Sequence, residues 1–334
     1  MSFKLIEGEK IFIAGANGMV GSSIKKELLS LGYNEENLLC PRRESLDLLN
    51  YKKLSEWFIF NKPTVVIIAA AKVGGIFANS EKPFDFILQN LKMQTNIIEL
   101  SWKNNVKKVL FLGSSCIYPK YSPQPINENN LLKDSLEQTN EFYAIAKIAG
   151  IKLCQSLMIQ HQFNAICLMP SNLYGPGDNY NLLNSHVIPA LIRKFHDAKL
   201  RDLKEVICWG DGSPLREFLF VDDLAKACVF LLNNWSPVQD LSQNELRKES
   251  SCIINVGSNY EVKIKDLANQ IALTIGFKGE IIWDKRKPNG TPRKKLDNSK
   301  INNLGWQAKT NLNQGLKITI DSYIKELKNN TLRK

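Results

Sequence analysis

The sequence predicts an α/β fold: a doubly wound parallel sheet with a smaller C-terminal α/β domain. Short apolar runs of the length of buried strands recur along the first half of the chain, at Ile11–Ala14, Val65–Ala70, Val109–Leu112 and Ala165–Met169. Longer stretches with apolar residues at helical spacing lie between them, most clearly 84–104 and 143–161. Strands that alternate with helices pair in parallel, because each crossover helix returns the chain to the same edge.

A glycine-rich loop follows the first predicted strand and leads into a helix. The loop has the order G-x-x-G-x-x-G and reads Gly15-Ala16-Asn17-Gly18-Met19-Val20-Gly21. Three spaced glycines alone could form an ordinary turn. Here an apolar strand precedes them, and an apolar stripe at helical spacing follows. That context is typical of a Rossmann-type dinucleotide site, in which the helix N-terminus binds the pyrophosphate. We therefore expect all seven residues to bind a dinucleotide.

The end of the second predicted strand indicates which dinucleotide binds. An acidic residue about 20 positions after the glycines holds the ribose hydroxyl of NAD. This chain has Arg42 and Arg43 there instead, after the run Leu38-Leu39-Cys40-Pro41. Arginine matches a phosphate in charge and in its forked geometry. The alternative is a pair of arginines that only face solvent. We predict that Arg43 binds the 2′-phosphate and that the cofactor is NADP(H).

Tyr143 and Lys147 are candidates for proton transfer. On a helix, side chains four residues apart lie on one face, about 5–6 Å from each other. A neighbouring ammonium favours the phenolate, so we expect Lys147 to lower the pKa of Tyr143. The earlier run Gly113-Ser114-Ser115-Cys116 offers the hydroxyl of Ser114 to orient a carbonyl. A tyrosine and lysine at this spacing are a weak signal alone, because about one chance match is expected in a lysine-rich chain.

Together, the glycine loop, the serine, the tyrosine and the lysine resemble the extended short-chain dehydrogenase/reductases along the whole chain. The resemblance implies further cofactor contacts around the nicotinamide end. They fall on Leu112, Gly113, Ser114, Ser115, Lys147, Pro170, Ser171, Asn172, Leu173 and His186. A cofactor-sensing binding protein on the same fold is the alternative from another class. Such proteins tend to lose the tyrosine or the lysine, and this chain keeps both.

Further motifs resemble the GDP-L-fucose synthase family within that superfamily. They are Gly113–Pro119, Tyr143–Lys147, Asn172–Pro176, Asn184–Ala190, Pro214–Phe218 and Gly290–Lys294. The resemblance implies NADPH-dependent 3,5-epimerisation and 4-reduction of GDP-4-keto-6-deoxy-D-mannose to GDP-L-fucose. It assigns the catalytic roles to Ser114, Cys116, Tyr143, Lys147 and His186. It assigns the substrate contacts to Lys194, Trp209, Arg216 and Asn289.

Three observations bear on these assignments. Sugar 4,6-dehydratases carry carboxylates after the catalytic serine or threonine, and the run Ser114–Pro119 has none. An epimerase or reductase of a related GDP-4-keto sugar, dideoxy or heptose, stays open as the alternative. By composition alone, Cys116 would be an apolar filler and His186 an ordinary polar residue. Two residues depart from the bacterial members of the family, which commonly have arginine at the position of Asn17 and aspartate at that of Asn289. Because Asn17 carries no charge, the expected preference for NADP over NAD depends on Arg43.

Composition restricts the other classes of protein that this chain could belong to. The chain has 334 residues, 44% of them hydrophobic, as expected for one large or two modest globular domains. Its net charge of +11 admits nucleic-acid binding, but the lysines are spread out. The densest basic cluster, at 285–287 and 293–295, surrounds a proline-rich loop that suits a phosphate-bearing small molecule. Three scattered histidines and seven cysteines without a C-x-x-C pair favour no metal site and no disulfide framework.

Organisation and location follow from the same patterns. We expect a Rossmann domain at 1–177 with returns near 210–233 and 252–258, and a substrate-binding domain at 178–209 and 259–330. Residues 234–251 are predicted to form a surface loop, and 328–334 a frayed tail. We expect no membrane partner, because no apolar run approaches the roughly 20 residues of a span. The seven cysteines without a disulfide pattern favour a reduced, cytoplasmic protein. The family further implies a homodimer that pairs the helices at 84–104 and 143–161.

Overall fold

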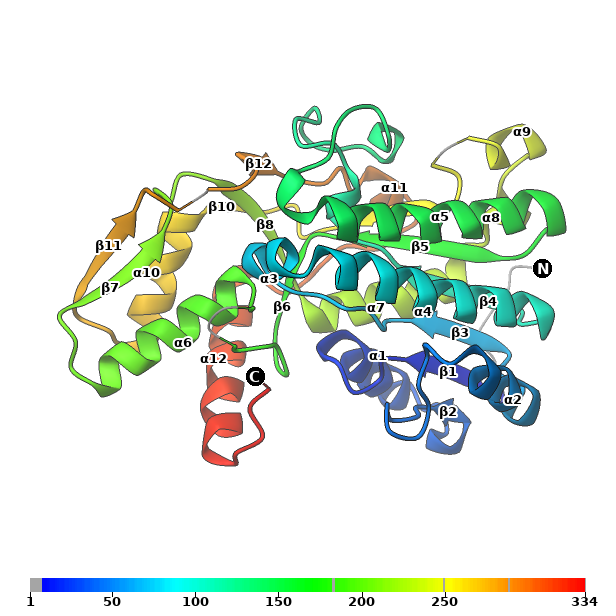
Figure 1. The fold of residues 1–334 in the computed structure, drawn as a ribbon, viewed down its shortest axis with the longest axis horizontal. Helices are drawn as coiled ribbons and strands as arrows, with labels where there is room; N and C mark the ends of the chain where they lie inside the picture. Colours follow the sequence, from blue (N-terminus) through cyan, green and yellow to red (C-terminus); the bar gives the residue numbers. More distant parts are fainter. Residues whose placement is uncertain (1–7, 182–183, 249, 288, 334) are drawn as a thin grey trace.

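A six-stranded parallel sheet forms the centre of the larger part of the molecule (Figure 1). The computed structural model describes residues 8–181, 184–248, 250–287 and 289–333. The strands lie in the order β2-β1-β3-β4-β5-β9, and every neighbouring pair is parallel. Their bounds are β1 Ile11–Ala14, β2 Leu38–Leu39, β3 Val65–Ile68, β4 Lys108–Leu112, β5 Ala165–Pro170 and β9 Ile253–Val256. The strand order reverses between β1 and β3, which is where doubly wound sheets bind ligands.

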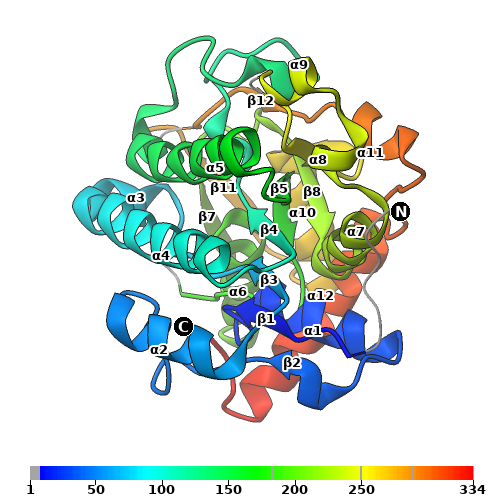
Figure 2. The ribbon, with the colours of Figure 1, turned by 90° about the vertical axis from the view of Figure 1, so that its right-hand side faces the viewer.

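Helices cover both faces of this sheet, as Figure 2 shows in a view along it. One apolar core combines alternate strand residues such as Phe12 with α2 (Tyr51–Asn61), α4 (Pro83–Lys103) and α5 (Glu141–His161). The other core combines residues such as Ile11 with α1 (Met19–Ser30) and α7 (Val221–Asn234). Successive strand residues point to opposite faces, so a strand buried on both sides is apolar throughout. The predicted doubly wound α/β class is confirmed.

A smaller part lies beyond the carboxyl ends of the strands. Its core contains α6 (Val187–Leu200), α10 (Ile264–Ile275) and α12 (Leu312–Lys328). The parallel pair β7 (Glu205–Trp209) and β11 (Glu280–Asp284) packs on these helices. A small sheet joins the two parts and consists of β6 Asn172–Tyr174, β8 Leu215–Phe220, β10 Glu261–Lys263 and β12 Arg293–Lys294. The remaining helices are α3 Ile76–Glu81, α8 Pro237–Asp240, α9 Gln243–Leu246 and α11 Ser299–Asn303.

Two local predictions need correction. The apolar run at Phe218 was expected to return to the large sheet, but it ends β8, which pairs with β6, β10 and β12. Its apolar residues are buried between the two parts, and periodicity cannot tell one buried sheet from another. The segment 328–334 was expected to fray, but residues after α12 fold back. Asn330 adopts a left-handed conformation (φ 54°), and the Thr331 amide donates to the Glu326 carbonyl over 3.0 Å.

One stretch of the described chain, Gln138–His161, is long and apolar enough by length and composition to cross a membrane. Half of its most apolar window is buried inside the protein. It includes α5, which packs along α4 and contributes Ile151, Cys154 and Met158 to the core. These contacts are those of a core helix in a globular fold.

Candidate active site

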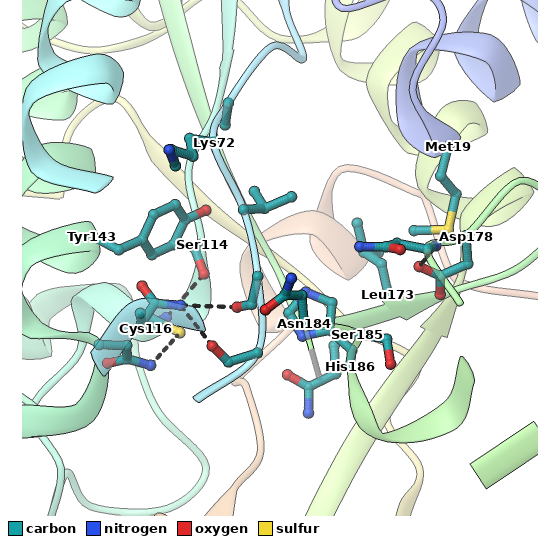
Figure 3. Close-up of a pocket in the computed structure, with 18 of the residues that line it drawn as sticks. Met19, Lys72, Ser114, Cys116, Tyr143, Leu173, Asp178, Asn184, Ser185 and His186 are labelled. Carbon is teal, nitrogen blue, oxygen red and sulfur yellow. Dashed lines mark hydrogen bonds between the residues drawn. The ribbon is translucent and has the colours of Figure 1, made fainter. Parts of the chain in front are cut away.

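A single cavity of about 920 Å³ lies at the carboxyl ends of the central strands, between the two parts of the molecule. Segments from both parts line it. Of the residues predicted to bind cofactor or substrate, or to catalyse, every one except Ala16 lines this cavity. Ala16 is buried beneath the glycine loop. Figure 3 shows the reaction end, with Tyr143, Ser114 and Cys116 on one side and His186 on another.

The glycine loop leaves room for a phosphate beside the N-terminus of α1. Gly15 has φ +86°, and a Cβ there would lie 2.7 Å from the Ala70 amide nitrogen. A Cβ on Gly21 would overlap the Gly15 carbonyl oxygen. Gly18 precedes α1 without a side-chain cap, and the first turn holds no acidic residue. The free N–H groups of that turn therefore face an open space, which fits a dinucleotide pyrophosphate. Exposed Arg43 lines the same cavity after β2.

Lys147 is buried beneath the reaction end of the cavity. Its Nζ donates to the Leu112 carbonyl over 2.8 Å and lies 4.7 Å from the Phe111 ring centroid. The distance from Nζ to the Tyr143 ring centroid is 6.0 Å, as expected for an i, i+4 pair on one helix face. The Ser114 side chain lies beside the Tyr143 hydroxyl and favours its phenolate, and the Ser114 Oγ accepts from the Cys116 amide over 3.2 Å. The three predicted residues Ser114, Tyr143 and Lys147 therefore form one connected group.

The predicted effect of Lys147 on Tyr143 is wrong for the protein without cofactor. Burial raises the pKa of Tyr143 above its ordinary value, because the phenolate loses its hydration. Burial also lowers the pKa of Lys147 to about 7, because the ammonium loses its hydration. A lysine that is only partly protonated cannot hold the phenol as an anion. Desolvation therefore outweighs the attraction that the i, i+4 spacing suggested.

Cys116 lies in a short turn after β4 and receives two donors. Asn140 Nδ2 lies 3.2 Å from its Sγ, and Lys294 Nζ lies 3.6 Å from it. Both contacts hold the sulfur at the reaction end of the cavity. Sequence reasoning did not assign either donor to the sulfur. Lys294 was noticed only as part of a basic cluster and of a family motif, and nothing in the pattern around Asn140 marked it.

His186 precedes the first residue of α6 and opens into the cavity. The protein atoms that crowd this wall lower the pKa of the imidazole by desolvation. The positive end of the helix dipole disfavours a cation at this position as well. His186 is therefore neutral near pH 7 and can accept a proton.

The far end of the cavity carries cations and an indole. Trp209 ends β7 and is 44% exposed. Lys194 Nζ lies 5.6 Å from its ring centroid and donates to the Ile207 carbonyl over 3.0 Å. Lys287 Nζ lies 5.3 Å from the same ring. An exposed indole flanked by two ammonium groups can stack on a flat base and attract the phosphates next to it.

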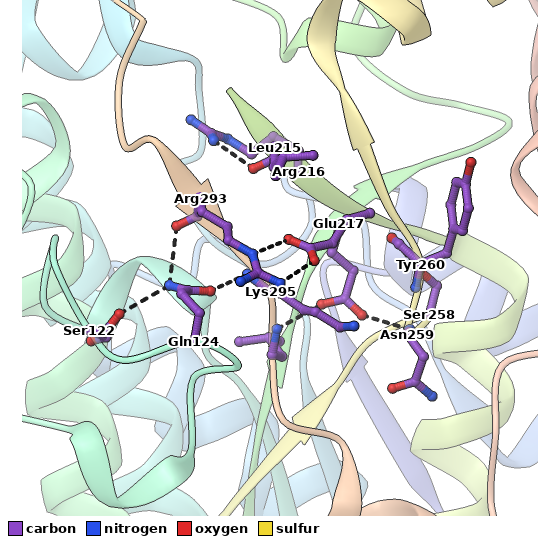
Figure 4. Close-up of polar contacts among 12 residues, drawn as sticks. Ser122, Gln124, Leu215, Arg216, Glu217, Ser258, Asn259, Tyr260, Arg293 and Lys295 are labelled. Carbon is purple, nitrogen blue, oxygen red and sulfur yellow. Dashed lines mark hydrogen bonds and ion pairs between the residues drawn. The ribbon is translucent and has the colours of Figure 1, made fainter. Parts of the chain in front are cut away.

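Arg216 reaches the cavity from β8, which polar contacts hold in place (Figure 4). Its Nη1 donates to the Leu215 carbonyl over 2.9 Å, and burial lowers the pKa of the guanidinium. The adjacent Glu217 is fully buried and accepts from the Asn259 amide over 2.8 Å. A two-bond ion pair of Arg293 and Glu261, at 2.8 and 2.6 Å, joins the strands on either side of β8.

Asn289 lines the cavity, and its side-chain oxygen is hydrogen-bonded within the protein. Its Oδ1 accepts from the Asp211 amide over 3.0 Å, which ties the segment after β11 to the turn after β7. Its side chain also hydrogen-bonds the Asp211 carboxylate, whose pKa is lowered chiefly by Ser213. Among the residues that the structure describes, no group of three His, Cys, Asp or Glu side chains is placed to hold a metal ion.

The site and fold together define a nicotinamide-dependent enzyme that acts on a carbonyl substrate. The chain belongs to the NAD dependent epimerase/dehydratase family, whose model matches residues 11–242. It is 52% identical over 320 residues to GDP-L-fucose synthase 1 of Arabidopsis thaliana, covering 96% of this chain and 94% of that protein.

Solved structures agree with this assignment. The chain resembles a GDP-6-OMe-4-keto-L-xylo-heptose reductase from C. jejuni with a TM-score of 0.91 at 34% identity, covering 97% of this chain and all of that one. It also resembles a GDP-mannoheptose C4 reductase from Campylobacter jejuni with NADP bound, with a TM-score of 0.84 at 34% identity over 96% and 99% of the two chains. The family resemblance predicted from the motifs is confirmed.

Proposed function

We propose that this protein converts GDP-4-keto-6-deoxy-D-mannose to GDP-L-fucose, by epimerisation at C3 and C5 and NADPH-dependent reduction at C4. The observation that carries the proposal is the convergence of five reactive side chains with four sugar-nucleotide contacts in one cavity. The relatives named GDP-L-fucose synthase, together with the family membership, support the substrate.

Epimerisation needs an acid and a base around an activated sugar. The C4 ketone acidifies the hydrogens on C3 and C5, so a positioned side chain can remove one and another can return it. Neutral His186 supplies a base, and Cys116, with donors from Asn140 and Lys294, supplies the second proton-transfer group. The enolate oxygen needs hydrogen-bond donors, which Ser114 and Tyr143 supply.

Reduction uses the same C4 oxygen. NADPH, when bound, supplies the hydride, and Tyr143 supplies the proton to the oxygen. The raised pKa of Tyr143 keeps its proton in place until the alkoxide forms. Lys147 lies below Tyr143, where its Nζ can reach the nicotinamide ribose and orient it. One pocket serves both stages because each of them passes through C4.

The cavity walls support the choice of GDP and NADP. Arg43 offers a phosphate ligand after β2, and one relative of 34% identity was solved with NADP bound. Lys194 and Arg216 are available for the diphosphate, and Trp209 for the base. Asn289 lines the same cavity.

Product analysis is the direct test. The purified protein is incubated with GDP-4-keto-6-deoxy-D-mannose and NADPH, and the product is identified by NMR. We expect GDP-L-fucose with one NADPH consumed per sugar. A 4-reduced product without inversion at C3 and C5 would contradict the epimerase half of the proposal, and no turnover would contradict both.

A second candidate is reduction of a different GDP-4-keto sugar. It is favoured by the two heptose reductases among the similar solved structures. GDP-4-keto-heptoses offered in parallel distinguish the two. A higher kcat/KM on a heptose than on the 6-deoxy sugar would select this candidate.

We also propose a homodimer through α4 and α5. Phe84 at the start of α4 is 70% exposed, and Phe142 and Ile145 on α5 are 44% and 39% exposed. Such a patch on two adjacent helices is typical of a subunit interface. Light scattering tests it: Ile145→Glu should give a monomer, and a monomeric unmutated protein would refute it.

All seven cysteines, which lie in the described part, are free thiols, in keeping with a cytoplasmic location.

A further inference from the structure

The segment after α12 returns to the glycine loop, more than 300 residues earlier in the chain. In Figure 1 the red chain that leaves α12 turns back and runs alongside the helix. A left-handed residue, Asn330, reverses the direction, and Leu332 packs against the apolar core of α6, α10 and α12. The Arg333 carbonyl then accepts from the Tyr180 amide over 2.9 Å. The main chain at Arg333 is therefore held without any contribution from its side chain.

The guanidinium of Arg333 points at the N-terminus of α1. Its Nη1 lies 3.8 Å from the place where a Cβ on Gly18 would be, and Arg333 lines the cavity. Within the described part of the chain, no hydrogen bond or ion pair engages this guanidinium. The side chains of Ala16 to Val20 carry no charge, so the loop itself supplies only N–H groups.

A cation at a helix N-terminus is unfavourable by itself, because it faces the positive end of the helix dipole. The arrangement becomes favourable when an anion lies between the guanidinium and the free N–H groups. The turn beside it carries a buried polar atom that faces the same cavity: Asp178 is 4% exposed, and no described residue hydrogen-bonds its Oδ2. Burial raises the pKa of Asp178 to about 7, so near neutral pH this carboxyl only partly neutralises Arg333.

Polar contacts fix the distance between this segment and α1. Glu326 of α12 accepts from the Gly177 amide over 3.1 Å and from Ser322 Oγ over 2.7 Å. Gly177 has φ +76°, and a Cβ on it would lie 4.0 Å from the Cα of Met19, the first residue of α1. The turn that carries Asp178 therefore abuts the glycine loop, and α12 is bonded to that turn.

We propose that Arg333 is a ligand of the dinucleotide pyrophosphate and that residues 331–333 complete the cofactor site begun by Gly15 to Gly21. Arg333 donates to the phosphate oxygens from the side opposite the α1 N–H groups. The role is distinct from that of Arg43, which is expected at the 2′-phosphate. This inference rests on the dinucleotide site of the proposed function, but not on the identity of the sugar.

Direct binding tests it, with Arg333→Ala, Arg333→Lys and the control Arg201→Ala, which removes an exposed arginine outside the cavity. Calorimetry measures the Kd of NADPH, of NADH and of adenosine 2′-monophosphate, which lacks the pyrophosphate. A charge-assisted bond at a partly exposed site leads us to expect Arg333→Ala to weaken NADPH and NADH equally, by about five- to twentyfold. Binding of adenosine 2′-monophosphate should not change, Arg333→Lys should recover part of the loss, and Arg201→Ala should bind as the unmutated protein.

Three results would overturn the proposal. Unchanged Kd values in Arg333→Ala would show that the guanidinium binds no part of the cofactor. A loss for NADPH and adenosine 2′-monophosphate that leaves NADH unchanged would move the contact to the 2′-phosphate. An equal loss for all three ligands would indicate a general effect on the fold, which thermal unfolding of each variant measures independently. If the unmutated protein binds NADPH but does not convert the sugar, the proposed function fails while the result for Arg333 still stands.

Discussion

Replacing Lys147 with methionine should stabilise the protein while abolishing reduction. Lys147 is 2% exposed, and burial lowers the pKa of its ammonium from 10.5 to about 7. At about 1.4 kcal/mol per unit, this shift corresponds to roughly 4–5 kcal/mol of unfavourable burial when the group is charged. Methionine has a similar length and no charge, but it leaves the Leu112 carbonyl without its lysine donor, which costs about 1–3 kcal/mol. At pH 6 we therefore expect the free energy of unfolding of Lys147→Met to be about 2–3 kcal/mol higher than that of the unmutated protein.

The pH dependence of this difference distinguishes desolvation from other causes. The folded-state pKa of Lys147 is below its unfolded value, so between about pH 7 and 10 the unfolded chain binds the additional proton. Stability of the unmutated protein therefore rises with pH in that range. The advantage of Lys147→Met should be constant below pH 7 and shrink by about 1.4 kcal/mol per unit above it.

Urea unfolding without dinucleotide, followed by tryptophan fluorescence at pH 6, 7, 8 and 9, measures the difference. Other titrating groups are common to both proteins and cancel. Lys317→Met, which removes an exposed lysine of α12, is the control and should show no such slope. A pH-independent difference, or a Lys147→Met protein that is less stable at pH 6, would refute the reasoning from burial.

Three further predictions concern the ligands. Arg43→Ala should raise the Kd for NADPH by roughly ten- to a hundredfold, the range of a charged hydrogen bond, and leave NADH unchanged; equal Kd values for both cofactors in the unmutated protein would contradict this. Cys116→Ser and His186→Gln should slow deuterium exchange at C3 and C5 by about 10²–10⁴-fold, while NADPH oxidation with an already epimerised substrate continues. Unchanged exchange in both variants would show that neither side chain transfers a proton. Arg216→Ala should weaken GDP binding strongly. Asn289→Asp should weaken it modestly, since the new carboxylate keeps the acceptor for the Asp211 amide. Calorimetry with GDP, UDP and dTDP measures these affinities, and UDP binding as tight as GDP would exclude a GDP-selective pocket.

The first half of the fold was readable from the sequence because its signals are local. A strand buried on both faces is an uninterrupted apolar run, so β1, β3, β4 and β5 could be located to within two residues at their ends. Their helices have apolar stripes that one face of the sheet buries. The glycine loop was equally clear, because close backbone approaches require glycine at Gly15 and Gly21.

Predictions of electrostatic effects were less successful. The spacing of Tyr143 and Lys147 placed both side chains correctly, but the sign of the tyrosine pKa shift was wrong. Spacing reports how close two groups are, whereas burial determines how much each charge loses in hydration. The same limit applies to Asn140 and Lys294, which meet Cys116 only because β12 and the turn before α5 converge on the segment after β4.

The sequence by itself determined the fold class, the cofactor loop, the serine–tyrosine–lysine group and, through motifs, the candidate acid and base. Each of these depends on residues within a few positions of one another, whose geometry a strand or a helix dictates. Only the tertiary structure decided which distant segments complete the site. The apolar run at Phe218 became part of β8, and the segment ending in Arg333 became a wall of the cofactor cavity rather than a frayed end. Long-range packing selects these positions, because an apolar or charged side chain carries no local mark of the partner it will meet.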